Sequence, residues 1–139
     1  MREIRYQLLF EGRVTPDDEM GMSMSLEARA RFTSAAEAVF AEGAPQAVYR
    51  AQVENAPDGS FSINGTLLFG GGTLTVEAEE PRLLIEVPGE AIHLATVSLR
   101  ITAGTGAFAG AKGRIASVFT VGEDGSLRDS QSGVVFLAS

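Results

Sequence analysis

Three side chains with a polar tip lie on sequence faces that are otherwise apolar: Tyr6, Tyr49 and His93. They are the two tyrosines and the one histidine of the 139-residue chain. A buried phenol needs a hydrogen-bond partner, which a ligand carbonyl can supply, and a buried imidazole can act as an acid, a base or a donor. We therefore predict that these three residues are catalytic and contact a substrate. The alternative is that they are core residues whose polar atoms bond to backbone groups.

The residue inventory excludes several other kinds of catalytic site. The chain has no cysteine, so it has no disulfide, no thiolate ligand and no cysteine nucleophile. A single histidine rules out a metal site built from several histidines, and no acidic loop of the EF-hand type is present. Ser117 and Ser132 lack a histidine and an acid in any recognisable motif, which argues against a hydrolytic triad. A carboxylate-only site for a hard cation is the alternative, but we expect no metal and no cofactor.

The composition is that of an acidic globular domain. Hydrophobic residues make up 45% of the chain, charged residues 21%, and the formal net charge is −7 at pH 7. An acidic protein without a basic cluster repels nucleic acid and anionic lipid. No segment is long and apolar enough to span a membrane, and the N-terminus lacks the apolar core of a signal peptide. We expect one domain over residues 1–139, located in the cytoplasm, with neither nucleic-acid nor membrane partners.

The elements that must position the three polar residues are short strands. Apolar and polar residues alternate with a period of two, and Pro, Gly and Asp residues separate the alternating segments. This pattern predicts strands at 4–14, 22–32, 47–54, 60–69, 73–79, 82–87, 92–102, 113–121 and 127–137. The capping-box sequence from Ser34 to Glu37, followed by Gly43 and Pro45, predicts one short helix at about 35–42.

Close, even spacing of short strands favours a small antiparallel β-barrel of about eight strands, an all-β fold without exposed sheet edges. The apolar face then lines the lumen, where a small apolar ligand or substrate fits. The predicted substrate-binding residues on this face are Met22, Met24, Leu26, Phe61, Ile63, Leu67, Val97 and Leu99. The opposite face carries Glu27, Arg29, Arg31, Asn64, Glu77 and Arg100. It is expected to be solvated; if the faces are inverted, Glu27, Arg29 and Asn64 line the lumen instead.

Four glycines separate two of the alternating segments: Gly104, Gly106, Gly110 and Gly113. Glycine adopts positive φ and allows close backbone approach, so such a segment forms the tight tip of a hairpin. A phosphate-binding loop is the alternative, but the spacing is not G-x-G-x-x-G, and a strand-like segment follows instead of a helix. We predict a structural hairpin tip in which several of these glycines have positive φ.

The same segment, 104–113, reads G-T-G-A-F-A-G-A-K-G and resembles the G-T-G-x-F-x-G-A-x-G signature of the allene oxide cyclase and dirigent-like barrel superfamily. A second shared feature is G-G-G-T-L-T-V at 70–76, where that superfamily has a glycine-led central strand. The resemblance covers the C-terminal half of the chain. It implies a calycin-like barrel that assembles as a homodimer or homotrimer.

The resemblance also implies a function. Enzymes of this superfamily are cyclases or isomerases that fold a reactive apolar substrate into a productive shape, mainly by orienting it and excluding water. We therefore expect a cofactor-independent cyclase or isomerase for a small polyketide-like or oxylipin-like substrate. Bacterial secondary metabolism is the expected setting, because Lys112 is the only lysine among the 11 basic residues, a bias typical of GC-rich genomes. The alternative is a barrel that binds or carries a small molecule without catalysis.

Overall fold

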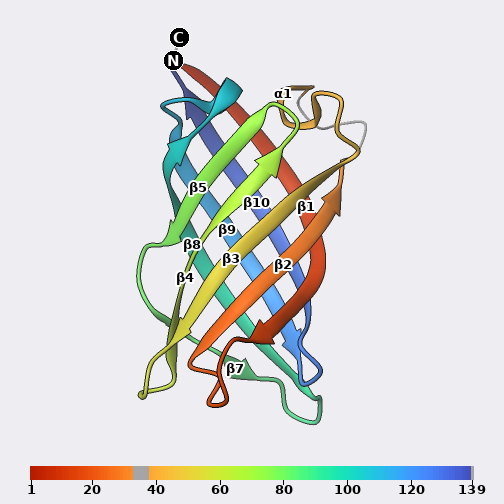
Figure 1. Cartoon of the computed structure of the whole chain (residues 1–139), viewed down its shortest axis with the longest axis vertical. Helices are drawn as coiled ribbons and strands as arrows, with labels where there is room; N and C mark the ends of the chain where they lie inside the picture. Colours follow the sequence, from red (N-terminus) through yellow and green to blue (C-terminus); the bar gives the residue numbers. More distant parts are fainter. Residues whose placement is uncertain (33–37, 139) are drawn as a thin grey trace.

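The chain folds as a closed antiparallel β-barrel in a computed structural model that describes residues 1–32 and 38–138 (Figure 1). Within this part of the chain, eight strands form the wall, and each pairs with its neighbours in chain order. They are β1 (Arg2–Pro16), β2 (Ser23–Arg31), β3 (Gln46–Asn55), β4 (Ser60–Phe69), β5 (Gly72–Ala78), β8 (Ile92–Gly104), β9 (Lys112–Gly122) and β10 (Ser126–Leu137). The first and last strands close the ring, so both termini lie at one end (Figure 1). The predicted all-β barrel is confirmed.

The segment predicted as a strand at 82–87 is not part of the barrel wall. It forms two short pieces, β6 (Arg82–Leu83) and β7 (Ile85–Glu86), which pair with the edges of β4 and β8. Both pieces are exposed to solvent. The prediction of a wall strand was wrong here, because β5 pairs directly with β8 and leaves no free edge between them.

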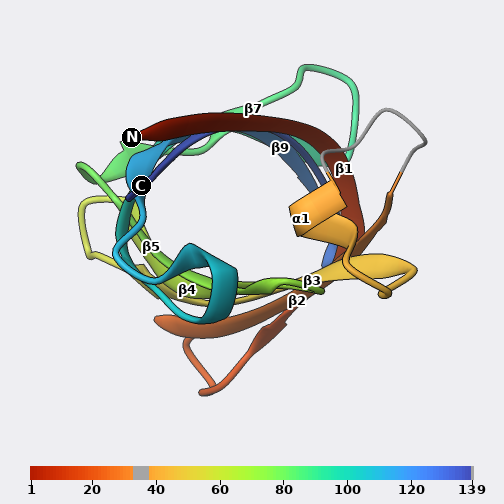
Figure 2. The same ribbon diagram turned by 90° about the horizontal axis from the view of Figure 1, so that it is seen from above.

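One short helix, α1 (Ala38–Ala41), lies over the end of the barrel that carries the termini (Figure 2). It falls within the predicted helix at about 35–42, whereas the capping-box residues before it lie outside the described residues. In the described part of the chain, no helix has the length and apolar character needed to cross a bilayer.

The glycine-rich segment connects β8 to β9 as the predicted hairpin tip, and it contains a single 3-10 turn, η1 (Gly106–Phe108). Three of its glycines have positive φ: +61° at Gly106, +74° at Gly110 and +146° at Gly113. The tip folds inward, so that the Phe108 side chain is fully buried. The prediction of a structural tip with several positive φ values is confirmed.

An aromatic plug of Tyr6, Phe40, Phe69 and Phe108 fills the lumen at the end that carries the termini. The rings of Phe40 and Phe108 stack with centroids 5.5 Å apart, and Phe69 contacts them at 4.9 Å and 5.6 Å. Tyr6 meets Phe40 edge-on at 5.3 Å. The helix and the hairpin tip therefore each contribute one buried ring that closes this end, hereafter the plugged end.

Replacing Gly106 with valine is expected to lower the free energy of unfolding by about 1–3 kcal/mol. Valine disfavours a φ of +61°, and its Cβ would lie 2.6 Å from the carbonyl oxygen of Gly71. Gly110→Val is the matched comparison, because its φ is +74° but open space surrounds the added Cβ. Urea unfolding should show the smaller loss for Gly110→Val. Equal stability of the Gly106 variant and the wild type would contradict the assignment.

Candidate functional site

The barrel lumen is lined by the apolar faces of the strands, as the alternation predicts. On β1 the inward residues Ile4, Tyr6, Leu8 and Phe10 are buried, while their neighbours are exposed. The charged and polar set predicted for the outer face comprises Glu27, Arg29, Arg31, Asn64, Glu77 and Arg100, of which Glu77 is half-buried and the others are exposed. The faces are therefore not inverted.

Three polar side chains interrupt the apolar lumen: Ser117 on β9, and Asp129 and Gln131 on β10. Each is at most 3% exposed. Ser117 Oγ donates to Asp129 Oδ1 at 2.6 Å, and Gln131 Nε2 donates to Asp129 Oδ2 at 2.8 Å. The Tyr6 hydroxyl donates to Gln131 Oε1 at 2.9 Å. These four residues, Tyr6, Gln131, Asp129 and Ser117, form a continuous lumen hydrogen-bond chain.

Gly133 makes room for the tyrosine that begins this chain. It lies directly opposite Tyr6 in the β1–β10 pairing, and the Tyr6 ring lies across it where a side chain would otherwise stand. With the ring in this place, the hydroxyl reaches Gln131, one inward position along β10. The absence of a side chain at Gly133 is therefore what directs the Tyr6 phenol into the hydrogen-bond chain.

Gly133→Ala is expected to destabilise the fold by about 1–3 kcal/mol, because the added methyl group would overlap the Tyr6 ring and displace it. The cost should shrink when the same change is made in a Tyr6→Leu background, which removes the ring. A double-mutant cycle measured by urea unfolding tests this coupling. Additive losses in the double variant would show that the two positions do not interact.

Burial controls the titration of the lumen groups. Removal from water raises the pKa of the Asp129 carboxyl, and the hydrogen bonds from Ser117 and Gln131 offset only part of this effect. Burial, followed by the nearby Asp129 charge, raises the pKa of both the Tyr6 and the Tyr49 phenols, so each keeps its proton as a donor. No buried residue in the described part of the chain is cationic. Burial therefore shifts Asp129 toward its neutral form relative to an aspartate in water.

The raised pKa of Asp129 makes stability depend on pH with a definite sign. The folded chain holds the Asp129 proton to higher pH than the unfolded chain, so its stabilising contribution is complete at low pH. That contribution is lost as pH rises from the unfolded pKa through the folded one. Between the unfolded and folded pKa values, the free energy of unfolding of the wild type should fall by up to about 1.4 kcal/mol per pH unit relative to that of Asp129→Asn.

Urea unfolding of both proteins across a pH series measures this difference. Asp124→Asn is the control of opposite sign. Hydrogen bonds from the side chain and backbone of Ser126 lower the pKa of exposed Asp124, so its contribution should be lost as pH falls. A stability difference between wild type and Asp129→Asn that stays constant with pH would contradict the raised pKa.

A pocket of about 140 Å³ opens at the end of the barrel opposite the plug, hereafter the pocket end. Its lining is apolar apart from Asn55 and comprises Val14, Met24, Leu26, Val53, Asn55, Phe61, Ile63, Leu84, Phe119, Val121 and Leu127. Asp129 is the next inward residue of β10 after Leu127, and it lies opposite Phe119 in the β9–β10 pairing. The inner wall of the pocket therefore borders the lumen hydrogen-bond chain.

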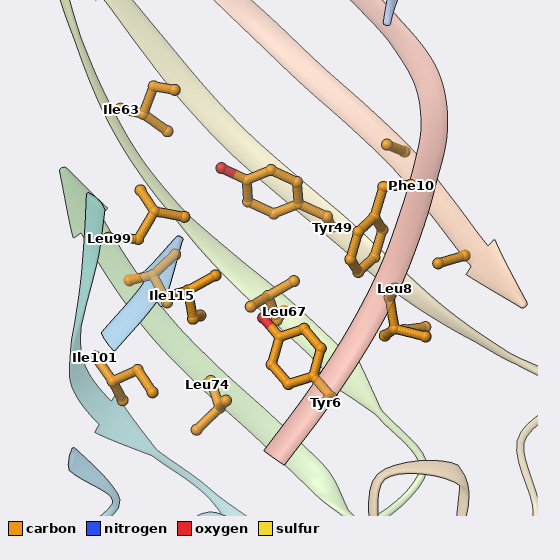
Figure 3. Close-up of a cluster of buried hydrophobic side chains, with 14 of the residues drawn as sticks. Tyr6, Leu8, Phe10, Tyr49, Ile63, Leu67, Leu74, Leu99, Ile101 and Ile115 are labelled. Carbon is orange, nitrogen blue, oxygen red and sulfur yellow. The ribbon is translucent and has the colours of Figure 1, made fainter. Parts of the chain in front are cut away.

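The Tyr49 phenol does not itself line this pocket, and it lies two inward positions along β3 from the pocket residue Val53. Its ring, 1% exposed, packs edge-on against Phe10 at 5.8 Å, and its hydroxyl points across the lumen toward Ile63 and Leu99 (Figure 3). Ile63 also lines the pocket. The Tyr49 hydroxyl donates to no other described residue, although every sealed side-chain polar atom in the described chain has a partner. The hydroxyl is therefore not completely sealed by the surrounding protein atoms.

The residues predicted to be catalytic separate in the structure. Tyr6 and Tyr49 both lie in the lumen, but the Tyr6 hydroxyl already donates its hydrogen bond to Gln131. His93 lies half-buried at the pocket end, opposite Glu86 and Val121 in the strand pairings, and it does not join the hydrogen-bond chain. Of the two tyrosines, only Tyr49 retains a donor that no described residue accepts.

The predicted substrate-binding residues also fall into groups. Met24, Leu26, Phe61 and Ile63 line the pocket. The side chains further inside are sealed in the core and comprise Leu67, Val97 and Leu99. Met22 does not face the lumen: it is 37% exposed and precedes β2, in a turn where its N–H donates to Asp18 Oδ1. The turn interrupts the alternation of inward and outward residues, so counting alternate positions assigned Met22 to the wrong face.

Asp129 and Gln131 were missed in the sequence, although the signal was present. Both share the parity of Leu127, Val135 and Leu137 in the last alternating segment, so they face the lumen with them. Ser117, which alternates with the buried residues Ile115 and Phe119, was considered only as a nucleophile. A search for polar residues at the inward-facing positions of the predicted strands would have found all three.

A second concavity lies on the outer surface of β1 to β4 and has a volume of about 770 Å³. It is wide open to solvent, and its lining includes Asn64 and charged residues that pair with one another, as Arg29 does with Glu27 at 2.8 Å. This surface suits a polar contact and not an apolar ligand. Among residues 1–32 and 38–138, no three acidic or histidine side chains gather as a metal site would require.

The barrel resembles two solved structures of dirigent proteins. It superposes on the pterocarpan synthase dirigent protein GePTS1 with a TM-score of 0.68 and 14% identity, covering 99% of this chain and 89% of that chain. The corresponding values for the pterocarpan synthase dirigent protein PsPTS1 are 0.68, 13%, 99% and 97%. No protein-family model matches the sequence, and a search of curated proteins also found no match. The fold is thus the closed, eight-stranded antiparallel barrel of dirigent proteins.

Proposed function

We propose that this protein binds a small apolar molecule at the pocket end of its barrel and directs its cyclisation or isomerisation without a cofactor. The observation that carries the proposal is an apolar pocket whose inner wall, at Phe119 and Leu127, adjoins the buried carboxyl group of Asp129. The dirigent fold supports it, as does the resemblance of segment 104–113 to the allene oxide cyclase and dirigent-like signature.

The chemistry follows from the lumen groups. The apolar wall holds the substrate in a folded shape and excludes water, so that reacting ends meet. Tyr49 donates a hydrogen bond to a substrate oxygen, and Asp129 donates or accepts a proton as bonds rearrange. Ser117 and Gln131 hold the two carboxyl oxygens of Asp129 in place. An isomerisation of this kind conserves every atom and needs no electron carrier.

The substrate proposed is a small, reactive, polyketide-like or oxylipin-like molecule of bacterial secondary metabolism. The pocket volume of about 140 Å³ admits only one end of such a molecule, and the remainder extends through the open mouth. A barrel that only carries its ligand is the second candidate. Sealed packing of the central lumen around Leu67, Val97 and Leu99 favours it, because little space remains for a whole substrate to fold.

A model precursor tests the proposal. In 2′-hydroxychalcone, a phenol oxygen adds across a carbon–carbon double bond conjugated to a ketone, and the product, flavanone, has one new stereocentre. The measurement is the rate of flavanone formation and its enantiomeric excess by chiral chromatography. We expect the folded protein to exceed the buffer rate and to form one enantiomer in excess, and heat-unfolded protein to do neither. Racemic flavanone at the buffer rate, together with saturable binding of the chalcone, would instead support the carrier.

A further inference from the structure

Resting on this proposed function, we infer the chemical class of the ligand: an uncharged molecule with one ring in the pocket and a carbonyl oxygen that accepts a hydrogen bond from Tyr49. The inference combines three properties of the described residues: one donor without a partner, the absence of a buried cation, and the size of the pocket.

The first property is the unmatched donor. Tyr6, Ser117 and Gln131 each already donate to a protein acceptor, and the two carboxyl oxygens of Asp129 each already accept. Tyr49 has no partner among the described residues, and its hydroxyl points toward Ile63 in the pocket wall (Figure 3). A buried donor without an acceptor is unfavourable, so a ligand that brings an acceptor gains the hydrogen bond there.

The second property is charge. No lysine, arginine or histidine among the described residues is buried, so an anionic ligand would leave water without gaining a buried counter-charge. A cationic ligand would lose its hydration and meet a carboxyl group whose oxygens already accept from Ser117 and Gln131. Both ionic classes are therefore disfavoured, and a neutral acceptor such as a ketone or aldehyde is favoured.

The third property is size. The pocket volume is about 140 Å³. An apolar cavity of about 150 Å³ takes up benzene, so a single aromatic or alicyclic ring fits and two fused rings do not. We expect the carbonyl group to lie on the side of the ring that faces Ile63, because Ile63 lines the pocket and the Tyr49 hydroxyl points toward it.

The experiment compares two ligands of nearly equal shape. Acetophenone carries a carbonyl oxygen where α-methylstyrene carries a methylene group. Dissociation constants for both are measured by NMR titration against wild type, Tyr49→Phe and Tyr6→Phe, whose amide spectra also show whether each variant is folded. We expect Tyr49→Phe to weaken acetophenone binding about five- to tenfold while α-methylstyrene binding is unchanged. In Tyr6→Phe, the ratio of the two constants should stay at the wild-type value, because that hydroxyl bonds to Gln131.

Benzoate is the anionic probe, and it should bind wild type at least tenfold more weakly than acetophenone. The inference is overturned if Tyr49→Phe weakens both neutral ligands equally, if it weakens neither, or if benzoate binds as tightly as the ketone. Its failure is distinct from failure of the proposed function. Loss of the Tyr49 effect with stereoselective flavanone formation intact refutes only the ligand class. An intact Tyr49 effect with racemic product refutes only the cyclisation.

Discussion

Replacing Phe108 with alanine is expected to lower the free energy of unfolding by about 3–5 kcal/mol, the largest stability effect predicted for this chain. The side chain is fully buried and contacts two other rings of the plug, at 5.5 Å to Phe40 and 5.6 Å to Phe69. Its removal leaves a cavity that the rigid barrel wall cannot close. The hairpin tip also loses the contact that holds it over the lumen.

Phe32→Ala is the matched control for this prediction. Phe32 is only half-buried, and its ring contacts Phe69 at the longer distance of 6.3 Å. Chemical unfolding should therefore show a clearly smaller loss for Phe32→Ala than for Phe108→Ala. Equal losses would mean that the plug contributes no more than the surrounding surface, and that the hairpin tip is held by its backbone alone.

Asp129→Asn is expected to slow the proposed cyclisation by about 10²–10⁴-fold, the range over which a positioned acid or base accelerates a reaction. The amide has the same shape as the carboxyl and can still bond to Ser117 and Gln131, so the lumen is preserved while proton transfer is lost. The initial rate of flavanone formation measures the effect. A variant rate near that of wild type would remove Asp129 from the reaction.

Ser117→Ala supplies the control that separates chemistry from packing. The Ser117 hydrogen bond lowers the pKa of Asp129, so its removal should raise that pKa further while the carboxyl remains. The pH–rate profile should then move to higher pH, with a much smaller loss of maximal rate than in Asp129→Asn. A structural role for Asp129 alone would leave the position of the profile unchanged.

Much of the fold was predictable because strand faces follow a period-two rule that depends only on neighbouring residues. The inward side of β1, from Ile4 to Phe10, and the outward position of Glu27 and Arg29 both follow from it. The rule failed where local geometry interrupts it. At Met22 a turn ends the alternation, and at 82–87 a strand-like segment has no place in the wall because β5 already pairs with β8.

The candidate site was predictable only in part, because parity tells which way a side chain faces but not what it meets. It placed Tyr6 and Tyr49 in the lumen, yet nothing in their spacing distinguishes them. The structure does: the Tyr6 hydroxyl reaches Gln131, 125 residues away in the chain, whereas the Tyr49 hydroxyl reaches none of the described residues. That difference decides which phenol is left to bind a ligand.

The sequence alone therefore determined the class of fold, the inward face of each wall strand and the structural role of the glycines between Gly104 and Gly113. These are local properties, set by side-chain alternation and by the conformations glycine permits. Only the tertiary structure decided that Phe40 and Phe108 meet to plug one end, that Asp129 joins Tyr6 through Gln131, and that about 140 Å³ stays open at the other end. The physical reason is closure of the barrel, because strand register sets which inward residues face one another across the lumen, and their packing together sets the volume left empty.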